Sequence, residues 1–113
     1  MADAAPVRCP PRLPGPHVGF EQVGPVPAAH WLLWGMRLFD VAPGATPTGR
    51  PPDNVAHNHD VVTETWRVLG HEPLLMMVCL YNGAGTYYQA RLSPPPARCV
   101  LHDDNGLTMA WCE

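Results

Sequence analysis

Proline is the feature that most constrains what this chain can fold into. The sequence holds 15 prolines in 113 residues, well over twice the average share of about 5%. Proline has no backbone N–H and a fixed φ angle, so it is excluded from helix interiors and from the middle of central strands. Because prolines recur along most of the chain, we predict strands, turns and extended connections in place of long helices.

The prolines divide the chain into an arm and a domain. Seven of them fall within residues 1–29, and we predict that this segment is a proline-rich extended arm with a short edge strand near residues 17–23. Residues 30–113 are predicted to form the antiparallel β domain. A chain of this length is expected to fold as one unit with one modest core.

Six segments of the domain have the length and alternation of β-strands, namely residues 30–41, 61–69, 74–81, 86–92, 98–104 and 107–112. Turn residues separate them at residues 70–73, 82–85, 93–96 and 105–106. A helix is the alternative for residues 30–41, but Gly35 and the Pro43-Gly44 pair argue against it. We therefore predict an all-β fold, a small antiparallel sandwich or partly closed barrel of about six strands.

The last hairpin sets the expected pairing of the cysteines. Asn105-Gly106 is a strong two-residue turn signal, because a type I′ turn needs positive φ at both positions. With that turn, Cys99 faces Cys112 in a non-hydrogen-bonded pair, where side chains approach closely enough for a disulfide. A four-residue loop would instead place Cys99 opposite Ala110. We predict the Cys99–Cys112 bridge and, by elimination, a Cys9–Cys79 bridge that fixes the arm.

Composition and cysteine content bear on compartment and function class. An even number of cysteines without a CxxC motif favours two disulfides in an oxidising compartment over four free thiols or a zinc site. The net charge of −3 argues against nucleic-acid binding, and the sequence has no apolar run long enough for a transmembrane helix. Ser93 lies in a proline run and Asp103-Asp104 beside a turn, so we expect no catalytic residues and no enzyme activity.

Residues 42–60 are predicted to be a long polar loop, and loops of that length are often functional. We expect a protein partner to bind there, through residues Arg50, Asp53, Asn54, His57, His59 and Asp60. His57 and His59 are also candidate metal ligands, because alternate residues of an extended segment point the same way. A complete metal site would require His71, Glu64 or Asp53 to converge on them, so no cofactor is assigned.

The chain resembles a family of small uncharacterised exported proteobacterial proteins. The resemblance rests on Cys9-Pro10 near the start, on Val78-Cys79-Leu80-Tyr81 followed by Gly85-Thr86, and on the two later cysteines. It implies export to the periplasm and two disulfides, and it supplies no catalytic residues.

Three functions follow as hypotheses. The first is a periplasmic or secreted binding or inhibitor protein, in its sharpest form an immunity protein that neutralises a secreted effector or hydrolase. The second is a periplasmic metal-binding protein that uses His57 and His59. The third is a structural component of the cell envelope.

Overall fold

The computed structural model describes residues 6–13, 18–25, 31–41, 44, 46–68, 74–81, 85–93 and 95–113. These residues form eleven β-strands, all paired antiparallel, in two sheets that do not close into a barrel. The prediction of an all-β fold with two disulfides is confirmed. The strands beyond the expected six are short, with two to five residues each.

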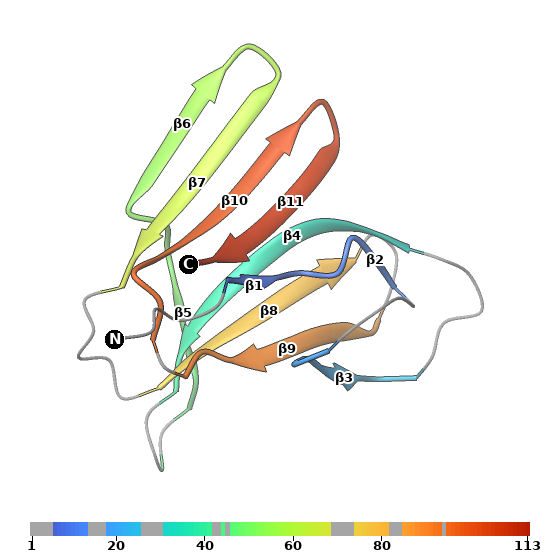
Figure 1. The fold of residues 1–113 in the computed structure, drawn as a ribbon, viewed down its shortest axis with the longest axis vertical. Helices are drawn as coiled ribbons and strands as arrows, with labels where there is room; N and C mark the ends of the chain where they lie inside the picture. Colours follow the sequence, from blue (N-terminus) through green and yellow to red (C-terminus); the bar gives the residue numbers. More distant parts are fainter. Residues whose placement is uncertain are drawn as a thin grey trace.

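The first sheet has five strands in the order β1-β11-β10-β7-β6. Their bounds are β1 Val7–Arg8, β11 Leu107–Cys112, β10 Arg98–Asp104, β7 Val61–Arg67 and β6 Asn54–Asn58. Figure 1 shows the β6–β7 and β10–β11 hairpins side by side, projecting away from the other sheet. A backbone hydrogen bond of 3.3 Å from Asn105 to Asp60 joins their two turns.

The second sheet has six strands and holds the longest one. Its order is β2-β4-β8-β9-β3, with β5 also paired to β4. The bounds are β2 Arg12–Leu13, β4 Trp31–Asp40, β8 Leu75–Tyr81, β9 Tyr87–Arg91, β3 Glu21–Val23 and β5 Thr48–Arg50. Strand β4 is central, because β8 pairs along one of its edges while β2 and β5 pair at the two ends of the other.

The core lies where the inner faces of the two sheets meet. Its fully buried side chains include Leu13, Leu38, Leu75, Met77 and Tyr88. Cysteine is equally prominent there, since Cys79, Cys99 and Cys112 are each 0% exposed. The sulfur of Cys112 lies 3.9 Å from that of Met77, so the bridge of one sheet packs directly on the middle of the other.

The predicted cysteine pairing is confirmed by both bridges. In the last hairpin Asp104 faces Leu107 and Cys99 faces Cys112, as a two-residue turn requires. Asn105 and Gly106 both have positive φ, at 53° and 84°, which is the backbone that a type I′ turn demands. The side chain of Asp103 also accepts a hydrogen bond of 2.9 Å from the N–H of Gly106.

The N-terminal arm crosses from one sheet to the other. Strand β1 pairs with β11, β2 with β4, and β3 with β9. The buried Tyr81 hydroxyl donates a 2.7 Å hydrogen bond to the Pro10 carbonyl, close to the Cys9–Cys79 bridge. Burial, and to a smaller extent Tyr88, raises the pKa of Tyr81 above its ordinary value, so the hydroxyl keeps the proton that it donates.

The prediction that residues 42–60 form one long loop is wrong, because two short strands interrupt the segment. Residues 48–50 pair with β4 as strand β5, and residues 54–58 pair with β7 as strand β6. Both are edge strands with largely exposed side chains, so they lack the apolar alternation that reveals a half-buried strand. Pro51 and Pro52 separate β5 from β6. The prolines of this segment still leave room for a short strand, since β5 fits between Pro47 and Pro51.

Some predicted features lie outside the described residues. These are the turns at 70–73 and 82–84 and the side chain of His71. Within the described part of the chain, no helix has the length and apolar character needed to cross a membrane.

Candidate functional site

The residues predicted to bind a partner lie along the side of the molecule where the chain passes from β5 to β6. Two of them hold this crossing in place. The Arg50 side chain contacts the Asp40 carboxylate at 3.6 Å, and the Arg50 carbonyl accepts a 2.8 Å hydrogen bond from the Trp66 indole. The Asp53 carboxylate accepts a 2.6 Å hydrogen bond from the N–H of Arg67. Arg50 and Asp53 therefore have structural contacts, and Asp53 is exposed together with Asn54, His57, His59 and Asp60.

The two candidate metal ligands do not share the extended geometry expected of them. His57 lies in β6, but His59 lies in the turn that follows, with a positive φ of 56°. The alternation that would point both imidazoles the same way ends at Asn58. Among the described residues no three His, Cys, Asp or Glu side chains come together as a group that could hold a metal ion.

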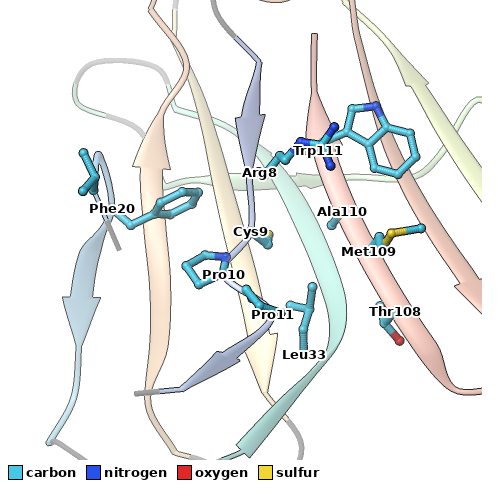
Figure 2. Close-up of a pocket in the computed structure, with 11 residues that line it drawn as sticks. Arg8, Cys9, Pro10, Pro11, Phe20, Leu33, Thr108, Met109, Ala110 and Trp111 are labelled. Carbon is cyan, nitrogen blue, oxygen red and sulfur yellow. The ribbon is translucent and has the colours of Figure 1, made fainter. Parts of the chain in front are cut away.

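A groove of about 370 Å³ lies between the arm and the outer edge of β11. We call it the β11 groove. Figure 2 shows its wall of β11 residues on one side, Phe20 on the other, and the arm residues with Leu33 between them. Its lining is mostly apolar and consists of Arg8, Cys9, Pro10, Pro11, Val18, Phe20, Leu33 and residues 108–111.

The groove exists because two prolines turn the arm away from the sheet. Strand β1 pairs with β11 at residues 111 and 112, and the N–H of Cys9 then donates to the Ala110 carbonyl at 2.9 Å. Pro10 and Pro11 have no N–H to continue this ladder. The chain passes to the other sheet, where the Pro11 carbonyl accepts from Leu33 at 3.0 Å. Beyond Ala110, no described residue pairs with the outer edge of β11.

Large apolar side chains stand exposed beside this groove. Alternation along β11 buries Ala110 and Cys112 and points Leu107, Met109 and Trp111 to the opposite face. Leu107 is 74% exposed and Met109 is 50% exposed, while Val18 on the arm is 97% exposed. Met109 and Val18 both line the β11 groove, so the exposed apolar surface and the hollow are continuous.

Arg8 is the charged residue in the described lining of the groove, and its charge acts on Glu113, the residue after β11, which pairs with Arg98 of β10. The Arg98 side chain donates a 2.8 Å hydrogen bond to the Glu113 carboxylate. This hydrogen bond is the main cause that lowers the pKa of Glu113 below its ordinary value, and the charges of Arg98 and Arg8 add to it. The carboxylate is therefore ionised, beside a cationic rim.

A second hollow of about 580 Å³ lies between β4 and the first sheet. Trp34, which is 53% exposed, forms one side, and Glu64, Trp66 and Leu101 face it from β7 and β10. Trp66 belongs to the core, at 3% exposed. Glu64 is the one carboxylate in its described lining, which contains no Ser, Thr, Cys or His side chain.

Sequence reasoning missed the β11 groove, although part of its signal was present. The register that pairs Cys99 with Cys112 also fixes which face of β11 is buried, and so it implies that Leu107, Met109 and Trp111 point outward. The hollow beside them required knowledge of how Pro10 and Pro11 redirect the arm in three dimensions. Comparison with known proteins adds no assignment, since the chain matches no family model, no curated protein and no solved structure.

Proposed function

We propose that this protein is an exported protein-binding module that docks a partner protein on the β11 groove and the adjacent outer face of β11. The observation that carries the proposal is the continuity of the groove with Met109 and Val18, two large apolar side chains that are at least half exposed. Exposed apolar surface joined to a hollow is typical of sites where another protein inserts an apolar side chain.

The frame around this surface suits recognition without rearrangement. The Cys9–Cys79 bridge holds one wall of the groove to β8, and the Cys99–Cys112 bridge joins β10 to β11, which forms the other wall. A surface held in this way loses little conformational freedom on binding, which favours affinity. The Arg8 side chain at the rim adds a charge that orients an acidic partner.

The narrower form of the proposal is an inhibitor or immunity protein that neutralises a secreted effector or hydrolase in the periplasm. Two disulfides fit an oxidising compartment, and the resemblance to small exported proteins agrees with it. The hollows carry apolar and aromatic side chains with few groups suited to acid–base or nucleophilic chemistry. A partner-blocking role uses such surfaces directly.

The test is capture of the partner from periplasmic extract and culture supernatant, followed by identification of the captured protein and assay of any hydrolase activity. The variant carrying both Leu107→Asp and Met109→Asp is expected to lose capture, because it places charges on the apolar face. Leu32→Asp is the matched control, since Leu32 is also an exposed apolar residue, 67% exposed, and lies on β4 of the second sheet, outside the lining of the β11 groove.

A second set of variants replaces the residues of segment 53–60 other than Ala56 by alanine. They test whether a partner binds the 53–60 segment, as the sequence predicts. That binding stays a prediction. Equal capture by wild type and by the Leu107/Met109 variant would refute docking on β11. If the 53–60 variants alone lose capture, the partner binds the β6 side.

A further inference from the structure

Strand β6 is an exposed edge without the usual protection. It ends the five-stranded sheet, and all five of its residues are exposed. Edge strands are commonly protected from pairing with other chains by lysine, proline, inward charges or bulges. The segment Asn54–Asn58 contains no proline and no Lys, Arg, Asp or Glu. None of the residues that the structure describes pairs with its outer edge, which can therefore accept a further strand.

The register identifies the backbone groups that face outward. Asn58 and Val61 flank the two-residue turn of the β6–β7 hairpin, and the pair closing such a turn is hydrogen-bonded. Hydrogen-bonded pairs alternate, so Ala56 bonds with Thr63. The N–H and C=O groups of Val55 and His57 therefore point away from β7. The 3.3 Å bond from Asn105 to Asp60 agrees with this alternation across the next strand pair.

The sequence around β6 is complementary to itself when reversed. Residues 53–59 read Asp-Asn-Val-Ala-His-Asn-His. In an antiparallel pair centred on Ala56, Val55 of one copy faces His57 of the other. This pairing places the outward N–H and C=O groups of Val55 in each copy opposite those of His57 in the other copy. The two resulting hydrogen-bonded pairs are related by the two-fold axis. Asn54 then faces Asn58, so two amide side chains that can bond to each other lie opposite at each end of the pair.

We propose that a second copy of this chain pairs antiparallel with β6, centred on Ala56, and joins two five-stranded sheets into one. No pair in this register places like charges opposite each other, a condition that stable cross-strand pairing requires. On one face Val55 lies between Glu64 of its own β7 and His57 of the second copy, which covers an apolar side chain that is 45% exposed in the single chain.

The dimer site is independent of the proposed partner surface. Strand β6 and strand β11 lie toward opposite edges of the first sheet, with β7 and β10 between them. A two-fold pairing through β6 leaves the β11 groove of each copy open. Failure of either proposal therefore leaves the other intact, and the Leu107/Met109 variant is expected to dimerise like wild type.

The first experiment measures self-association of the full chain by analytical ultracentrifugation. An interface this small predicts a weak dimer, with a Kd on the order of 100 μM. Ala56→Asp and Ala56→Lys each place like charges at the two-fold axis and are expected to weaken the dimer by about tenfold or more. A mixture of the two variants places opposite charges there and is expected to restore heterodimers. Wild type that stays monomeric up to about 1 mM, or a mixture that associates no better than each variant alone, would overturn the proposal.

The second experiment tests the register by cysteine cross-linking under mild oxidation. Ala56→Cys is expected to form a disulfide dimer rapidly, because the Ala56 pair on the axis is a non-hydrogen-bonded pair with close side chains. Val55→Cys and His57→Cys are expected to cross-link slowly alone and rapidly when mixed. If a dimer forms but Val55→Cys alone cross-links as fast as Ala56→Cys, the register centred on Ala56 is refuted. Unchanged urea midpoints of the single variants would show that each copy remains folded.

Discussion

The two disulfides differ in the length of chain that they close, and this difference predicts how much each one stabilises the fold. The Cys9–Cys79 bridge spans a sequence separation of 70 and the Cys99–Cys112 bridge one of 13. In the chain-entropy model these loops give about 4.4 and about 3 kcal/mol. The difference, (3/2)RT ln(70/13), is about 1.5 kcal/mol.

Two variants make the comparison, one with Cys9 and Cys79 replaced by alanine and one with Cys99 and Cys112 replaced by alanine. The difference between their free energies of unfolding is nearly free of packing effects. All four cysteines are 7% exposed or less, so each variant loses two buried sulfur atoms. The free energy that the two variants lose through packing is therefore similar, and the remaining difference reports loop closure.

Urea unfolding followed by tryptophan fluorescence measures the two losses. With a urea m value of about 1.5 kcal/mol/M, the Cys9/Cys79 variant should unfold roughly 1 M earlier than the Cys99/Cys112 variant. Equal midpoints, or an earlier transition for the Cys99/Cys112 variant, would refute the argument. Such a result would mean that the arm is structured in the unfolded ensemble or that native strain dominates.

Three further predictions concern single contacts. Tyr81→Phe leaves a buried carbonyl without its donor, and it should cost about 1–3 kcal/mol in urea unfolding at neutral pH. Because the pKa of Tyr81 is raised in the fold, wild-type stability should fall as the pH rises above the ordinary value of 10.0, and the variant should lose less. Gly24→Ala should cost about 1–3 kcal/mol in the same assay, since φ is 106° and a Cβ would lie 2.7 Å from the Thr86 hydroxyl; an unchanged midpoint would contradict that geometry. In an NMR titration the pKa of Glu113 should lie below its ordinary value of 4.5 and should rise in Arg98→Ala. Because the folded state lowers this pKa, the stability that the ionised Glu113 adds is lost as the pH falls. A pKa that does not change in Arg98→Ala would show that the hydrogen bond with Arg98 does not cause the shift.

The parts of the fold that were predictable are those where local signals agree. Asn105-Gly106 specifies a turn, the turn specifies the register, and the register brings Cys99 opposite Cys112. Residues 86–92 likewise have the alternation of a strand, and the structure buries Tyr88, Ala90 and Leu92 on one side of it. In these segments turn chemistry, alternation and burial point to the same structure.

The edge strands and the groove were not predictable because their determinants are not local. Strand β6 is exposed along its whole length, so no hydrophobic pattern distinguishes it from a polar loop. It is a strand because β7 offers a free edge, which is a property of the assembled sheet. The β11 groove depends in the same way on where the arm crosses, since nothing near Met109 in the sequence indicates that Phe20 and Pro10 lie across from it.

The pairing of β1 with β11 bears on when the two ends of the described chain come together during folding. Val7 lies opposite Cys112, so the first described strand has its partner in the last. We expect a contact between residues so far apart in sequence to form late, because the entropy of closing the intervening chain opposes it. On this expectation the outer edge of β11 is exposed until β1 pairs with it, and the Cys9–Cys79 bridge, which directly follows β1, holds β1 near that edge. A chain in which Cys9 is mispaired would present that edge, with its row of apolar side chains, to other molecules, so correct oxidation of this bridge also protects the folding protein from aggregation.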